Sequence, residues 1–198
     1  MSGRLRATLA LVLLAAAPAA AARPREQPAP RIEVLEARRD GERFVVSYRL
    51  LDLLPPEVME RIHSGIRLRF RHRIEIVEPR PGLFAGDRTH GRATLETSVS
   101  YDSLTQRYEL AREIALRDRA RGPAAEPLEE RTLVDSEQEM RSWLTEVREL
   151  AISDPHEAET VDPTLRVRIE VVLGRRWILL VIPSSETISV EQELGAGG

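Results

Sequence analysis

The chain has 198 residues, of which 29 are basic and 32 acidic, and it contains no cysteine. A chain with a small negative charge is a poor candidate for a general nucleic-acid binder, because such domains are usually strongly basic. The absence of cysteine excludes disulfides, thiol catalysis and cysteine-ligated zinc. Every basic residue is an arginine, which fits a GC-rich genome and makes arginine abundance alone weak evidence for a function.

Residues 1–22 predict a cleaved export signal. Two arginines precede the uncharged run 7–22, which is shorter than the roughly 20 apolar residues that a membrane-spanning helix needs. Ala20 and Ala22 form the small-x-small pattern of a cleavage site, which places the cut between Ala22 and Arg23. The alternatives are a retained membrane anchor and a buried core helix. We expect a periplasmic or secreted protein with no transmembrane segment after cleavage.

The mature chain predicts a single β-rich domain over residues 31–192. The preceding residues 23–30 are polar and rich in proline, which is typical of a flexible lead-in. The final residues 193–198 end in the sequence GAGG and predict a disordered tail.

The first elements are a hairpin and a short helix. Strands are predicted at 31–38 and 43–51, joined through Asp40-Gly41, a pair that favours two-residue hairpin turns. Residues 55–65 predict a helix with proline in its first turn and Gly65 as its end.

Residues 66–76 alternate more regularly than any other stretch. One face carries Arg67, Arg69, Arg71 and Arg73. A period of two over this length predicts a long, half-buried strand. The inward face consists of Ile66, Leu68, Phe70, His72, Ile74 and Ile76.

Two interpretations of this arginine stripe are open. It is either a surface for phosphates, lipopolysaccharide or an acidic partner, or the solvated outer face of a sheet. We expect the solvated face, because opposite charges across neighbouring strands are mildly stabilising. No exposed aromatic residue interleaves with the arginines, as single-stranded nucleic acid would require for stacking. The acidic candidates on neighbouring strands are Glu96, Glu109, Glu113 and Glu170.

The rest of the chain predicts further strands and a second helix. Strands are predicted at 93–101, 106–116, 164–173, 176–182 (a central strand) and 188–192 (an edge strand). Loops are predicted at 79–91 and 117–134, a turn at Gly174-Arg175, and a helix from Asp135 or Ser136 to about Leu150. The apolar face of that helix would carry Met140, Trp143, Leu144, Val147, Leu150 and Ala151, and Arg141 would lie on its solvent face. Seven or eight antiparallel strands with two short covering helices indicate a mainly β fold, an antiparallel β-sandwich or a strongly curved sheet.

The stretch IHSGIRLRFRHRIEI, followed by YDSLTQRYEL, resembles the signature of the bacterial domain-of-unknown-function family 4390. The resemblance extends over residues 31 to about 182 and is sharpest at 64–110. It implies an exported, single-domain protein and carries no assigned activity. The matching residues are Ser64, Gly65, Leu68, Phe70, Tyr101, Leu104, Thr105 and Tyr108.

No catalytic pattern is found in the sequence. His63, His72, His90 and His156 do not form an HxH or HExxH spacing, and no G-x-S-x-G, P-loop or G-x-G-x-x-G motif is present. The acidic run 154–159 has the ligand types for a cation but is more typical of a solvated turn. We expect no enzymatic activity, no cofactor and no metal.

Two functions remain open. The first is an exported, non-enzymatic interaction or adaptor module of the envelope, with an unknown envelope protein or lipid as partner and no nucleic acid. The alternative is a periplasmic β-sandwich that binds a small molecule or lipid. A continuous cavity beneath the 143–147 part of the second helix would favour the alternative, and a filled core would favour the first.

Overall fold

The computed structural model describes residues 28–82, 86–117, 127–153, 165–178 and 182–195. The predicted signal at 1–22 and most of the lead-in lie outside these residues. In chain order the elements are β1 (Arg31–Asp40), β2 (Arg43–Leu51), α1 (Pro56–His63), β3 (Leu68–Glu78), β4 (Arg88–Asp102), β5 (Arg107–Arg117), β6 (Leu128–Val134), α2 (Glu137–Thr145), β7 (Glu146–Ser153), β8 (Arg166–Ile178) and β9 (Ile182–Glu193).

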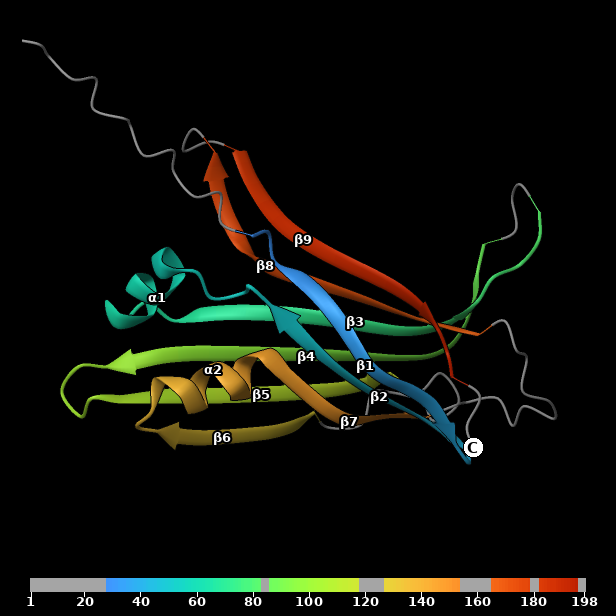
Figure 1. The fold of residues 1–198 in the computed structure, drawn as a ribbon, viewed down its shortest axis with the longest axis horizontal. Helices are drawn as coiled ribbons and strands as arrows, with labels where there is room; N and C mark the ends of the chain where they lie inside the picture. The colour runs from blue at the N-terminus through green and yellow to red at the C-terminus, as the bar shows by residue number, and fades with distance from the viewer. Residues whose placement is uncertain (1–27, 83–85, 118–126, 154–164, 179–181, 196–198) are drawn as a thin grey trace, which may run out of the picture.

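The strands form two antiparallel sheets that pack face to face. The small sheet has the order β1-β2-β7, and the large sheet has the order β6-β5-β4-β3-β8-β9. In Figure 1 the small sheet crosses diagonally over one face of the large sheet, and α2 lies over the same face beside it. The predicted mainly β, antiparallel sandwich is confirmed, with nine strands among the described residues rather than seven or eight.

Alternate side chains along the strands point between the sheets and form the core. On β3, Phe70, His72, Ile74 and Ile76 are all buried, as the alternation predicts. Ile66 was expected on the same face, but it precedes the strand and its side chain is 46% exposed. The core therefore begins at β3 itself, while the chain leaving α1 stays at the surface.

As expected, one glycine lies in the turn of the first hairpin and another follows the end of the first helix. Asp40 pairs with Arg43, so the two-residue turn is Gly41-Glu42, one residue later than predicted. Gly41 has a φ of 60°, which glycine adopts without steric cost. Gly65 follows α1 with a φ of 80°, and a β-carbon at this position would meet the carbonyl oxygen of Tyr101 at 3.7 Å.

The predicted helix to Leu150 is wrong in its second half. α2 ends at Thr145, and the chain continues directly into β7. Glu149 has a φ of 50° and its backbone N–H donates to the Ser47 hydroxyl at 3.0 Å, which makes a bulge in β7. The bulge puts Val147 and Leu150 on the same buried face although they are three residues apart. A bulge in a strand therefore gives buried residues the three-residue spacing that is also typical of a helix.

The predicted loop at 117–134 is also wrong over its last part. Residues 128–134 form β6, which pairs with β5 along its length at the edge of the large sheet. Its charged centre, Glu129 to Arg131, shows no alternation because an edge strand contacts water on more than one side. The other predicted loop, 79–91, ends early, since β4 begins at Arg88. A register shift opposite Ile76 and Val77 breaks the alternation there.

The C-terminal strands differ from the prediction as well. The predicted turn at Gly174-Arg175 is a register irregularity inside β8, which continues to Ile178. The predicted central strand 176–182 is therefore wrong, because its residues divide between the end of β8 and the start of β9, with 179–181 outside the described residues. β9 is an edge strand, as expected for 188–192.

Disorder was predicted from residue 193 onwards, but the structure describes ordered residues up to 195. Glu193 belongs to β9, and the next two residues hydrogen-bond to both sheets. The N–H of Leu194 donates to the carbonyl of Leu165, and the N–H of Gly195 donates to the carbonyl of Ala37, each at 2.9 Å. The bond from Gly195 joins the end of β9 to β1 along one side of the sandwich. Residues 196–198 lie outside the described part.

Candidate functional site

The arginine stripe lies on the outer face of the large sheet, next to acidic side chains on the neighbouring strands. Glu96 of β4 contacts two of its members, with an N–O distance of 3.0 Å to Arg71 and 3.6 Å to Arg69. The remaining ion pairs are Arg67–Glu109 at 2.9 Å and Arg73–Glu170 at 3.7 Å. Three of the four acidic candidates therefore pair with the stripe, whereas Glu113 lies opposite Glu96 and Glu129 in the strand register.

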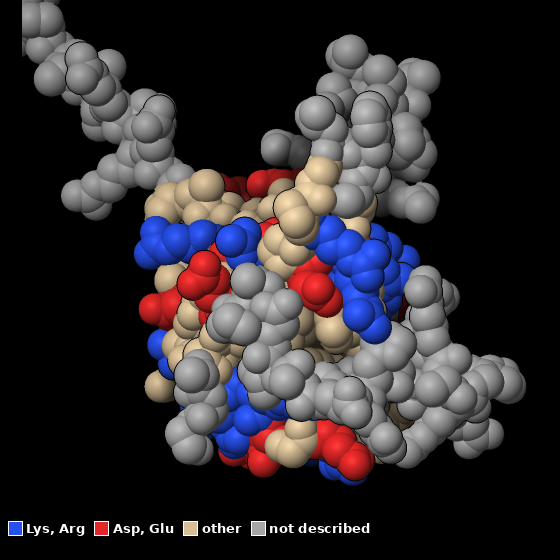
Figure 2. All heavy atoms as spheres, turned by 90° about the vertical axis from the view of Figure 1, so that its right-hand side faces the viewer, with Lys and Arg blue, Asp and Glu red and all other residues tan. Residues whose placement is uncertain are grey.

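These pairs make the stripe a mixed-charge surface. All four arginines are more than half exposed, and exposed ion pairs of this kind contribute little net stability. Figure 2 shows the same pattern at one end of the molecule, where basic and acidic side chains lie side by side over the described residues. The geometry fits a solvated outer face, with four arginines against three glutamates.

His72 is part of the core and not of a surface site. Its Nδ1 lies 2.7 Å from the Tyr48 hydroxyl and its Nε2 lies 3.4 Å from the Thr97 hydroxyl. A neutral ring protonated on Nε2 satisfies both contacts, with Tyr48 as donor to Nδ1. Burial, and secondarily the charge of Arg112, lowers the pKa of His72 to about 3. Burial also raises the pKa of Tyr48 well above its ordinary value, so this network carries no charge near neutral pH.

His63 anchors the end of α1 to the β4–β5 hairpin. Its Nε2 lies 2.7 Å from the Tyr108 hydroxyl, and its ring meets Tyr101 edge-on at a centroid distance of 5.4 Å. The two tyrosine rings lie 4.9 Å apart. Burial, followed by the charge of Glu137, raises the pKa of Tyr108. The rings fill the corner between α1 and the hairpin, which fixes the position of the hairpin's far end.

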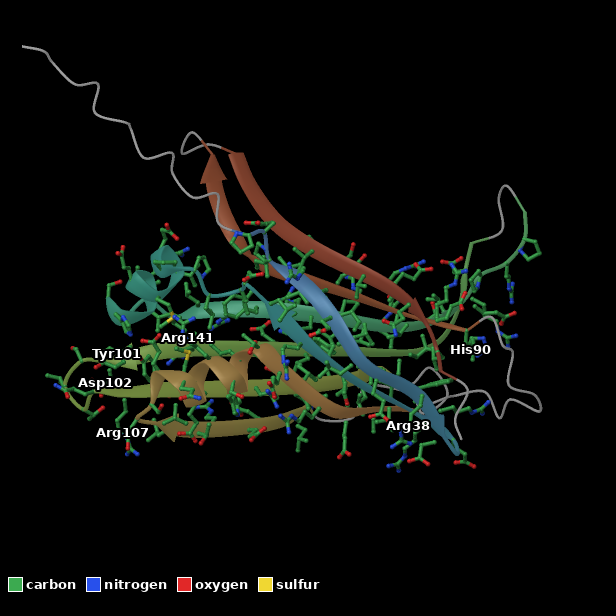
Figure 3. The ribbon with its side chains drawn as sticks, viewed as in Figure 1. Arg38, His90, Tyr101, Asp102, Arg107 and Arg141 are labelled. Carbon is green, nitrogen blue, oxygen red and sulfur yellow. The ribbon has the colours of Figure 1, made fainter. Side chains whose placement is uncertain are left out.

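Residues 102–107, the hairpin tip, form a turn held by one carboxylate. Asp102 accepts hydrogen bonds from the backbone N–H of Leu104 and from the Thr105 hydroxyl, both at 2.9 Å. These bonds lower the pKa of Asp102, the bond from Leu104 having the largest effect. Gln106 completes the turn with a φ of 57°, and Arg107 pairs with Asp135. The turn is fixed in place, yet it leaves Leu104 93% exposed. Figure 3 shows Tyr101, Asp102 and Arg107 together at this end of the molecule.

Other site types have limited support. The described residues contain no group of three or more histidine or acidic residues placed to hold a metal ion, and the acidic run 154–159 lies outside them. No helix in the described part of the chain is long and apolar enough to cross a bilayer. His90 of β4 is buried and lies 2.8 Å from a carboxylate oxygen of Glu78 across the β3–β4 hairpin.

Comparison with known proteins gives a family. The family model described as "Domain of unknown function (DUF4390)" matches residues 27–176, which is most of the chain. The chain belongs to the DUF4390 family. No curated protein and no solved structure matches it.

Most of the residues by which the sequence resembles the DUF4390 family have a structural role. Gly65 supplies a positive φ beside Tyr101, Ser64 donates its hydroxyl to the Arg61 carbonyl at 2.8 Å, and Thr105 closes the hairpin tip. The remaining apolar and aromatic members are buried or packed against the core: Leu68, Phe70, Tyr101 and Tyr108.

Leu104 is the exception in the signature. It is the most exposed of the large apolar side chains in the described residues, and the fold gives its side chain no packing role. The sequence predicted strands on both sides of this turn, at 93–101 and 106–116, but did not reveal the exposure of Leu104. The available signal was an apolar residue between the turn-forming Asp102 and Thr105.

Proposed function

We propose that this DUF4390 protein is an exported, non-enzymatic interaction module of the cell envelope that holds a protein partner through its hairpin tip. The observation that carries the proposal is Leu104, an exposed apolar side chain on a turn whose backbone is held by Asp102. A single exposed leucine is common on protein surfaces. Here, however, the leucine lies within the stretch by which the sequence resembles the family and on an ordered turn, where binding a partner costs little additional ordering.

The surroundings of the hairpin tip support a contact surface. Ile66 is also partly exposed and follows Gly65, which packs beside Tyr101 at the same end of the large sheet. Two exposed apolar side chains, Leu104 and Ile66, therefore lie on ordered backbone near the place where His63 packs against Tyr101 and Tyr108. Loops positioned by a rigid scaffold are common sites of recognition.

The burial of two α2 side chains supports a packed interaction module. Met140 and Leu144 of α2 are fully buried against the core. The core is filled beneath these two side chains, which is the arrangement expected for the first of the two functions, although an apolar cleft lined by Val147 lies beyond the end of the helix. The neutral, buried state of His72 also removes the most buried of the described histidines from consideration as a catalytic group.

The test is site-specific photo-crosslinking in the native host. The full-length chain carries a photo-reactive residue at position 104, and a matched control carries it at position 42, in the β1–β2 turn at the opposite end of the molecule (Figure 1). We expect one protein to be captured at 104 and not at 42, and Leu104→Ser to abolish its co-purification without changing the unfolding midpoint. Capture of lipid alone, or equal capture at both positions, would contradict the proposal.

A further inference from the structure

An apolar cleft of about 350 Å³ lies between the two sheets, beyond the end of α2. It is distinct from the hairpin tip and from the filled space under the helix. Most of its lining is aliphatic, from the inner face of the large sheet and from β7. The main members are Leu95, Ile114, Leu116, Leu128, Val147 and Leu150. Leu128 is 67% exposed although its strand register directs it inward, opposite Ile114.

Arg112 supplies a cation at the α2 end of this cleft. Its guanidinium stacks 4.3 Å from the ring centre of Trp143, and Nη2 donates to the carbonyls of Trp143 at 2.9 Å and Glu146 at 3.4 Å. Its Nε is buried and has no hydrogen-bond partner among the described residues. Desolvation by burial lowers the pKa of this guanidinium.

No carboxylate in the described part of the chain forms an ion pair with Arg112. Glu130 lies opposite it in the β5–β6 register, but that side chain is exposed and attracts the guanidinium only from a distance. A partly desolvated cation without a paired anion is energetically unfavourable, and a bound anion would relieve this. The neighbouring wall is aliphatic, so the complementary ligand has an anionic head and an apolar body.

We propose that the cleft binds a single-chain anionic amphiphile of the long-chain carboxylate class, with its carboxylate at Arg112 and its chain along the aliphatic wall. Ligand pockets usually measure about 300–1,000 Å³, so a volume near the lower limit suits one acyl chain better than a two-chain lipid. A peptide strand is less suitable, because charged residues occupy the centre of β6 and oppose strand addition at that edge. This inference does not depend on the proposed partner at the hairpin tip.

The first experiment measures binding by the delipidated mature chain, using calorimetric titration with dodecanoate. We expect saturable one-to-one binding and much weaker binding of dodecyltrimethylammonium, which has the same chain and the opposite charge. Ile114→Trp fills the cleft and should weaken dodecanoate binding by about tenfold or more. Its control is Ala115→Trp, the next residue on the same strand but on the outer face, which should bind as wild type does.

Two charge variants test the head-group assignment. Arg112→Gln should weaken binding, while Glu130→Gln should strengthen it, because a negative charge opposite the arginine is removed. If Arg112→Gln fails to fold, the Glu130→Gln variant and the ammonium amphiphile still decide the question. The proposal is overturned if dodecanoate does not saturate, if Ile114→Trp and Ala115→Trp behave alike, if Glu130→Gln does not strengthen binding, or if the ammonium compound binds equally well. Preferential binding of a lysophospholipid phosphate over the carboxylate would overturn the ligand class.

Discussion

The buried histidine His72 makes a specific prediction about acid stability. Its pKa lies near 3 in the folded protein, while an unfolded histidine titrates near 6.5. Below pH 6.5 the unfolded chain gains a proton that the folded chain does not bind. Neutral His72 thus stabilises the fold fully above pH 6.5, and this contribution is lost as the pH falls towards 3.

The expected size follows from the distance below pH 6.5. Each pH unit in this window removes about 1.4 kcal/mol, so a change to pH 4.5 should remove about 2–3 kcal/mol. The carboxylates with lowered pKa values, Asp102, Glu146 and Glu191, interfere little, because their contributions begin to be lost only as the pH reaches their ordinary pKa values, at the lower end of this window. The window from pH 4.5 to 6.5 therefore reports mainly on histidine.

Urea unfolding of the mature chain at pH 7 and at pH 4.5, followed by circular dichroism, measures this difference. His72→Gln should be less stable at pH 7, because the core loses a well-packed ring, but its stability should change less between the two pH values. Met140→Ala, a core change that removes no titratable group, serves as the control and should retain the wild-type difference between the two pH values. Parallel losses in wild type and His72→Gln would show that His72 is not neutral and buried in the way described here.

Four other predictions are open to direct measurement. Arg69→Gln combined with Arg71→Gln should change the free energy of unfolding by no more than about 1 kcal/mol, since both ion pairs are exposed. Phe70→Asp should abolish folding, because this side chain is buried in the core. Loss of lipopolysaccharide binding by the folded double variant would show instead that the stripe is functional. Met140→Ala should cost about 2–5 kcal/mol in urea unfolding, because the side chain is fully buried, and the cost should exceed that of Trp143→Ala, which is only partly buried. Truncation after Gln192 should lower the unfolding midpoint, while truncation after Gly195 should not, because Leu194 and Gly195 bond to both sheets. Amino-terminal sequencing of protein from the native host should begin at Arg23, and an intact, membrane-embedded terminus would refute the predicted cleavage.

The sequence predicted those strands whose two faces differ in environment. On β3 and β4 one face contacts the core and the other contacts water, so hydrophobicity alternates and the parity of every central residue follows. The acidic partners of the arginine stripe were predictable for the same reason, since outward positions on adjacent strands must lie near one another. Three of the four candidates pair as the charge pattern indicated.

Prediction failed where the backbone departs from regular pairing. The positive φ of Glu149 shifts the parity of β7 and produces apolar spacing that resembles a helix. Gly174 lies in a bulge of β8, whereas the pair Gly174-Arg175 between two apolar stretches is typical of a turn. β6 has little buried face, so its residues show no period at all. The first two errors come from local irregularities that only the partner strand reveals, and the third comes from exposure at the edge of the sheet.

The residues that carry the proposals were not predictable from pattern alone. Arg112 occupies an inward position on β5, where the alternation calls for an apolar side chain, and in sequence it is one arginine among many. Its significance depends on the contact with Trp143 of α2, which is distant in the chain. Leu104 likewise becomes informative only when its exposure and the hydrogen bonds of Asp102 are seen together.

Among the described residues, the unequal sheets leave one side of the sandwich closed and the other side open. Three strands cannot cover the inner face of six, and α2 covers only part of the difference. On the side of β1 and β9, the C-terminal residues join the two sheets through backbone hydrogen bonds. On the side of β6 and β7, aliphatic side chains of the large sheet border the cleft. Apolar surface facing water is unfavourable, and a ligand that covers it binds the folded state alone. Occupation of the cleft would therefore complete the packing that the three-stranded sheet leaves unfinished.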